Sequence, residues 1–95
     1  MHKWAGEIRA IVEREHCSEE AFKKFFADPC WQELVDTLHT RLAITRDELE
    51  MVEGKELYRC QGDARSIRFA LAMEELIMSE FATVRSEKEI DDAER

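Results

Sequence analysis

Apolar residues recur at intervals of three or four along most of the chain, a pattern that predicts amphipathic α-helices. The first such stretch, residues 3–16, has its apolar side chains on one helical face, at Trp4, Ile8, Ile11 and Val12. A second short helix is predicted over residues 19–27, because Ser18 can cap its free amides and Glu19 and Glu20 suit its positive first turn. Its aromatic side is formed by Phe22, Phe25 and Phe26.

The clearest boundary in the chain is Asp28-Pro29, since aspartate caps helices and proline suits the first helical position. A long helix is therefore predicted over residues 29–53, and Gly54 then stands where a left-handed C-terminal residue belongs. Its apolar seam has heptad-type spacing and comprises Trp31, Val35, Leu38, Leu42, Thr45, Leu49 and Val52, with Leu34 widening it at the start.

A second seam follows Gly54, displaced by one residue from the phase of the first, which predicts that the chain turns there. It comprises Leu57, Cys60, Ala64, Ile67, Leu71, Glu74, Met78 and Phe81. The two arms, residues 29–53 and 56–81, are nearly equal in length, so an antiparallel pairing would match them end to end. The expected fold is all-α, a long antiparallel helical hairpin preceded by two short amphipathic helices.

One domain is expected over residues 1–84. Residues 85–95 are expected to form a charged tail, frayed or disordered, because Ile90 is their only large apolar residue. Beside the second seam lies a further apolar stripe, which the N-terminal helices or a second copy of the chain should cover. The residues expected to contact proteins are Phe22, Phe25, Phe26 and Trp31, together with the stripe Ala70, Met73, Ile77 and Val84.

Composition agrees with a folded helical protein that is not a general nucleic-acid binder. Gly occurs three times and Pro once, and 44% of the residues are apolar. The formal charge of −8 repels phosphate backbones and anionic membranes. Because no apolar run is long enough for a membrane span or a signal peptide, a cytoplasmic location without membrane contact is expected.

No catalytic, cofactor-binding or metal-binding residue is expected. Cys17, Cys30 and Cys60 are odd in number and lack CxxC spacing, so they are interpreted as reduced thiols. With His16 and His39 these cysteines could supply zinc ligands, but no spacing among them makes such ligands converge. Cys–His catalysis is disfavoured because no Gly-rich turn supplies an oxyanion hole.

Two polar features have competing interpretations. Glu74 falls on the second seam, where a register-fixing role is favoured over catalysis. Arg59, Arg65 and Arg68 could form a phosphate-binding stripe, but Glu56 and Asp63 intervene, so solvated ion pairs are favoured.

Three short patterns lie within residues 29–77, which make up about half of the chain: Pro29-x-Trp31-x-x-Leu34, Arg46-x-x-Leu49-Glu50 and Leu57-Tyr58-Arg59-x-Gln61-Gly62-x-Ala64-Arg65. With them, the segment from Pro29 to Ile77 resembles small helical proteins of unassigned role encoded by tailed bacteriophages, often near head and virion genes. The resemblance implies no catalytic residues. Tyr58, Gln61 and Gly62 are its least generic parts, and a glycine within a helix usually marks a close backbone approach.

The leading hypothesis is a non-enzymatic structural or assembly component of a phage particle, located in the virion or in the cytoplasm of the infected host. It would pair with itself as a homo-oligomer or with a larger virion protein, without a small-molecule substrate. The alternative is a phage-encoded inhibitor of a host enzyme or defence complex, which would use the charge of −8 to occupy a basic surface. Lys and Arg interspersed among the acids speak against that alternative.

Overall fold

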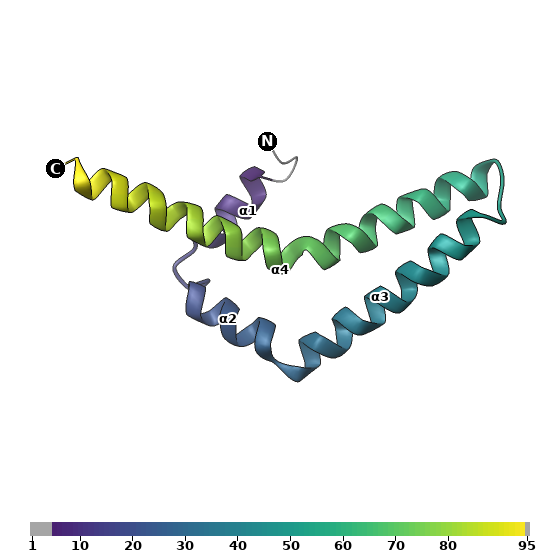
Figure 1. Cartoon of the computed structure of the whole chain (residues 1–95), viewed down its shortest axis with the longest axis horizontal. Coiled ribbons are helices and arrows are strands. Elements are labelled where there is room, and N and C mark those ends of the chain that lie inside the picture. Colours follow the sequence, from purple (N-terminus) through teal and green to yellow (C-terminus); the bar gives the residue numbers. More distant parts are fainter. Residues whose placement is uncertain (1–4, 95) are drawn as a thin grey trace. The chain divides into compact units, whose positions relative to one another are not determined.

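The computed structural model describes residues 5–94, and every regular element within them is an α-helix. The helices are α1 (Ala5–Val12), α2 (Glu19–Ala27), α3 (Pro29–Leu49) and α4 (Lys55–Ala93) (Figure 1). The all-α prediction is confirmed. Trp4, which was assigned to the first apolar face, lies outside the described residues.

Contacts divide the chain into two compact units, where the sequence had indicated one domain over residues 1–84. The hairpin unit comprises residues 27–73, which include α3 and the first part of α4. The three-helix unit comprises α1, α2 and the part of α4 from Glu74 onward.

In the hairpin unit the chain reverses where the two seams change phase. Residues 50–54 connect α3 to α4, and Gly54 has a φ of 63°, a left-handed conformation that glycine adopts without strain. Figure 1 shows the first part of α4 returning alongside α3 in the opposite direction. At the other end of α3, Asp28 Oδ1 accepts a hydrogen bond of 2.7 Å from the Cys30 amide, so the predicted cap is present.

The core of the hairpin unit lies on the two seams, at Leu42, Thr45, Cys60 and Ala64. Thr45 is 1% exposed, and its hydroxyl donates to the Arg41 carbonyl over 2.9 Å, which satisfies it within its own helix. Leu34 does not widen this core as predicted, because its side chain is 57% exposed.

The arms of the hairpin are less alike than the sequence indicated. Helix α3 has 21 residues, whereas α4 has 39 and leaves the hairpin unit after Met73. Helix α4 also continues through residues 85–93, which were expected to fray. This stretch contains no glycine or proline, and its Glu, Lys and Ala are good helix formers.

The three-helix unit begins with a helix shorter than predicted. Helix α1 ends at Val12, whereas the apolar pattern had suggested residue 16. Residues 13–16 are charged or polar and exposed, so no burial offsets the cost of ordering another turn. Helix α2 has the predicted bounds, because the Ser18 hydroxyl caps it by accepting from the Ala21 amide over 3.1 Å.

The core of the three-helix unit joins the short helices to α4. Its buried apolar side chains are Ile8, Phe26, Ile77 and Phe81. The Phe22 ring lies 5.6 Å from that of Phe26 and 5.8 Å from that of Phe81. The apolar stripe of α4 is therefore covered within the chain at Ile77, which is 5% exposed.

Candidate functional site

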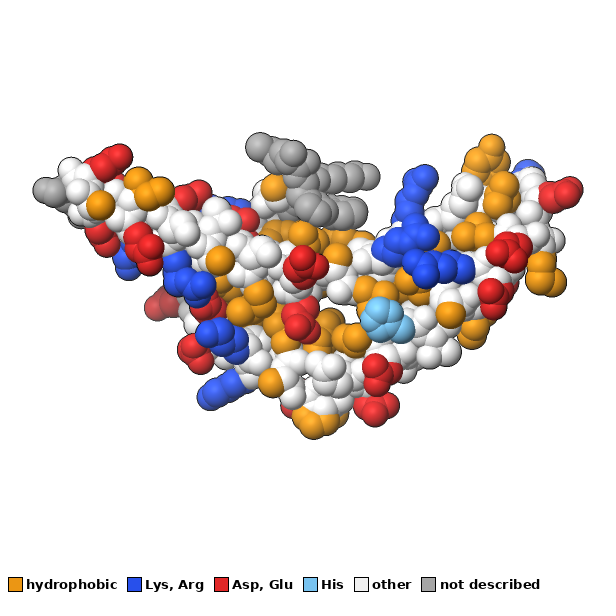
Figure 2. Space-filling view, viewed as in Figure 1, with side chains coloured by type: hydrophobic (Ala, Val, Ile, Leu, Met, Phe, Trp, Pro, Cys, Tyr) orange, Lys and Arg blue, Asp and Glu red, His pale blue; other side chains and the backbone are white. Residues whose placement is uncertain are grey.

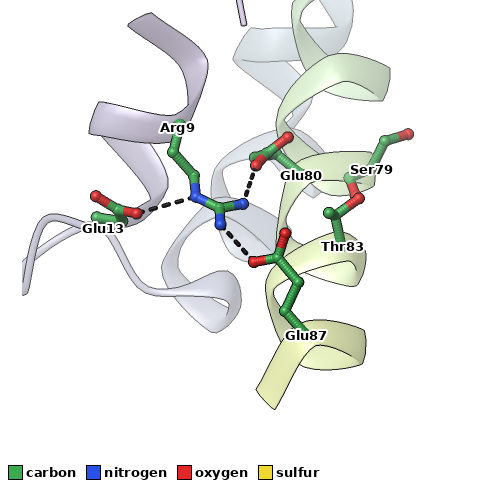
Figure 3. A network of polar contacts seen from close by, with 6 residues as sticks. All are labelled: Arg9, Glu13, Ser79, Glu80, Thr83 and Glu87. Carbon is green, nitrogen blue, oxygen red and sulfur yellow. Dashed lines mark hydrogen bonds and ion pairs between the residues drawn. The ribbon is translucent and has the colours of Figure 1, made fainter. Parts of the chain in front are cut away.

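The strongest polar cluster in the described residues surrounds Arg9 of α1 (Figure 3). Its guanidinium donates to Glu13 over 2.9 Å and to Glu80 over 2.5 Å, and it also donates to Glu87. The hydrogen bonds to Glu80, Glu87 and Glu13, in that order of importance, raise the pKa of Arg9 above its ordinary value. The permanently charged Arg9 thus links α1 to α4, which is a structural role.

A second ion pair links α2 to α4 in the same unit. Arg85 of α4 donates to the carboxylate of Glu19, which lies in the first turn of α2. Lys23 also lies near this carboxylate, at 3.9 Å. Both short helices are therefore held on α4 by charged groups that flank an apolar core.

The aromatic side of α2 is only partly available to another protein. Phe26 is 7% exposed and Phe22 is half-buried, whereas Phe25 is 52% exposed. Phe25 packs edge-on against Phe26 with 5.5 Å between ring centroids. A hollow of about 190 Å³ beside it is lined by His16, Cys17, Ala21, Phe22 and Phe25.

The eight residues expected to contact proteins differ in accessibility. Phe26 and Ile77 are buried within the chain, so neither is presented to a partner, and the expectation must be corrected there. Phe25 is exposed. The remaining five are half-buried: Phe22, Trp31, Ala70, Met73 and Val84.

Several exposed apolar side chains were missed by the sequence reasoning. Leu34 and Ile44 of α3 are 57% and 42% exposed. Each directly precedes a seam residue, so both lie on the same flank of the helix, about 100° from the seam. Beyond α3, Met51 is 83% exposed and Tyr58 of α4 is 75% exposed. The sequence could have indicated this flank, because Leu34 and Ile44 each directly precede a seam residue.

The cysteines lie in three different environments. Cys60 is fully buried, Cys17 is half-buried and Cys30 is exposed, and all are free thiols. Burial raises the pKa of the Cys60 thiol, whose sulfur is 3.7 Å from Glu48 Oε2. Within residues 5–94, no three His, Cys, Asp or Glu side chains gather as they would around a metal ion.

The arginine stripe of α4 separates into two parts. Arg59 forms ion pairs with Glu56 at 2.7 Å and with Asp63 at 3.6 Å, so the ion-pair interpretation is confirmed for this residue. The hydrogen bond from Glu56 and its charge raise the pKa of Arg59. Arg65 and Arg68, in contrast, line an open groove of about 300 Å³ with Leu49, Gln61 and Ala64.

Two polar or flexible positions singled out in the sequence lie in open surroundings. Glu74 is exposed, so the second seam is not buried at this position. Gly62 marks no close backbone approach, because a Cβ built on it would meet nothing within 4 Å.

No protein-family model, curated protein or solved structure matches this chain. No described helix combines the length and the apolar character that crossing a membrane requires.

Proposed function

We propose that this chain is a non-enzymatic structural or assembly component of a phage particle, acting through helix–helix contacts with itself or with a larger virion protein. The observation that carries the proposal is the excess of exposed large apolar side chains. Within residues 5–94, these are Phe25, Leu34, Ile44, Met51, Tyr58 and Ile90.

A small core makes this exposure significant. In the described part of the chain, only seven hydrophobic side chains are buried, and two of these belong to Cys60 and Ala64. Each large apolar side chain left in water forgoes roughly 1.5–3 kcal/mol of burial free energy, against a stability of about 5 kcal/mol for a small domain. Association that buries several of them would therefore contribute substantially to stability.

The flank of α3 that carries Leu34 and Ile44 is the best surface for such an association. Both side chains lie on one helix, on a flank beside the seam that packs on α4 in the hairpin unit. Figure 2 shows further hydrophobic side chains on the outer surface near the hairpin turn. A helix face of this kind suits another helix, because side chains three and four apart form ridges that pack into grooves.

The acidic-inhibitor alternative has less support. It requires a continuous anionic surface, whereas the hairpin unit carries Arg65 and Arg68 on a groove without a carboxylate against them. The charge of −8 is the observation that keeps this alternative worth testing.

The test is the mass of the chain in solution and its presence in particles. Light scattering coupled to size exclusion at micromolar concentration should give a multiple of 11.2 kDa. The double variant Leu34→Glu with Ile44→Lys, which changes only exposed positions and preserves net charge, should lower that mass. His39→Glu with Ala43→Lys, exposed residues that each directly follow a seam residue and so lie on the other flank of α3, is the matched control and should leave the mass unchanged.

Two outcomes would contradict the proposal. One is a clean monomer for the wild type together with absence of the chain from purified phage particles. The other is tight binding of the monomer to a basic host protein, which would favour the inhibitor alternative.

A further inference from the structure

The groove on the hairpin unit combines an apolar floor with a basic wall. Leu49 of α3 and Ala64 of α4 provide the apolar part, and Gln61, Arg65 and Arg68 rise from α4. Figure 2 shows basic side chains gathered over this part of α4. Because Gln61 and Arg65 directly follow seam residues, the groove runs along one edge of the interface between the two arms.

The two arginines of the groove are not neutralised by the chain itself. Neither Arg65 nor Arg68 has a carboxylate within ion-pair distance among residues 5–94, whereas Arg59, two turns earlier, contacts both Glu56 and Asp63. A protein of charge −8 has enough acidic side chains to form ion pairs with both arginines. Because both arginines line one groove, they form a local positive surface that can attract an external anionic group.

A segment with complementary chemistry ends the same chain. The C-terminal acidic segment, residues 86–94, is helical through Ala93, and all of its side chains are exposed. Its acids are Glu87, Glu89, Asp91, Asp92 and Glu94. Among them Ile90 is 61% exposed and is the segment's only large apolar side chain.

We propose that the groove of one chain binds the C-terminal acidic segment of a second copy. Ile90 of the second copy would rest on the accessible part of Leu49, and Glu94, which shares the helix face of Ile90, and Glu89, which flanks it, would accept hydrogen bonds from Arg65 and Arg68. Arginine suits this task because its planar fork can bind a carboxylate through two parallel hydrogen bonds. The proposal rests on the self-association included in the proposed function and specifies which surfaces carry it.

A second copy is favoured over the chain's own segment. Arg68 and Ile90 lie on one uninterrupted helix, α4, so binding within a single chain would require that helix to break. The contact joins two different surfaces, groove and segment, so it is heterologous and propagates into a ring or an open filament. Such growth suits an assembly component.

The experiment compares charge reversal in the groove with the same reversal elsewhere. Light scattering of the full chain at about 50 mM salt should show assemblies that shrink at about 500 mM salt, because exposed ion pairs are screened. Arg65→Glu with Arg68→Glu should weaken association about tenfold or more. Arg14→Glu with Lys24→Glu, exposed residues of the three-helix unit outside the groove, makes the same change in net charge and should leave association within about twofold.

A charge swap then tests the pairing directly. Glu89→Arg with Glu94→Arg should also weaken self-association, and mixing this variant with the Arg65→Glu, Arg68→Glu variant should restore assemblies of mixed composition. Circular dichroism of each variant should show unchanged helix content, since every altered side chain is exposed.

The outcomes separate this inference from the proposed function. If the wild type assembles and both groove and control variants assemble equally well, the groove assignment is wrong while self-association stands. A wild type that stays monomeric at low salt overturns this inference, and it overturns the proposed function as well when the chain is also absent from purified phage particles. If inorganic phosphate raises the melting temperature of such a monomer, and the groove variant abolishes the rise, the groove binds a small anion and not a second copy.

Discussion

The ring of Phe22 on α2 lies 5.8 Å from the ring of Phe81 on α4, although the two residues are far apart in the sequence. Phe81 is 8% exposed, so this contact belongs to the core of the three-helix unit. It shows that a residue expected to sit on a hairpin seam is covered by an N-terminal helix.

Replacing Phe81 should be costly, because the core around it is small. Phe81→Ala should lower the free energy of unfolding by about 3 kcal/mol, the scale for deleting a buried aromatic ring. The matched control is Phe25→Ala, which should cost less than about 1 kcal/mol because Phe25 is 52% exposed. Urea titrations followed by circular dichroism measure both. Equal losses for the two variants would show that Phe25 is also buried, by contacts with another molecule.

Glycine substitutions should have opposite effects at two positions. Gly62→Ala should raise the free energy of unfolding by about 1 kcal/mol, since Gly62 is helical and a Cβ there meets nothing within 4 Å. Gly54→Ala should lower it by about 1 kcal/mol, because the φ of 63° is strained for alanine. Thermal melts of the two variants measure the difference. A destabilised Gly62→Ala would indicate that a partner surface approaches that side of α4.

The Arg9 cluster should contribute to the docking of α1. Arg9→Gln removes the groups that contact Glu80, Glu87 and Glu13, so the melting temperature should fall by a few degrees. Amide hydrogen exchange should accelerate at Ile8 and Ile11. The control is Arg14→Gln, at an exposed position between the helices. Unchanged exchange in the Arg9 variant would mean that apolar contacts alone hold α1.

Cys60 should make the free energy of unfolding depend on pH in the alkaline range. Burial raises its pKa in the native state, so above about pH 8.5 the unfolded chain releases a proton that the native state retains. The free energy of unfolding should therefore decline as pH rises from there towards the native pKa, and Cys60→Ala should flatten that decline. A thiol reagent at neutral pH should modify the exposed Cys30 first and Cys60 only on unfolding. Rapid modification of Cys60 in the native state would contradict its burial.

The sequence by itself determined the features that depend on a few adjacent residues. Asp28 and Pro29 start α3 because a carboxylate can reach an amide two residues away and proline needs no amide partner. Ser18 starts α2 for the same local reason. The phase change at Gly54 revealed the hairpin, since a straight helix would have placed charged side chains in the seam.

The tertiary structure alone decided which apolar faces are covered and which distant charged groups meet. Arg9 of α1 donates to Glu87 of α4, 78 residues later in the sequence, and no local pattern predicts such a contact. Ile77 and Phe25 have similar apolar character in the sequence, yet only Ile77 is buried, because only three-dimensional packing determines which side of a helix meets a neighbour.

The groove beside Arg65 and Arg68 likewise exists only when Leu49 of α3 lies across from α4. Charge spacing in the sequence could suggest these arginines, but it could not separate them from Arg59, because ion pairing depends on the position of each side chain in space.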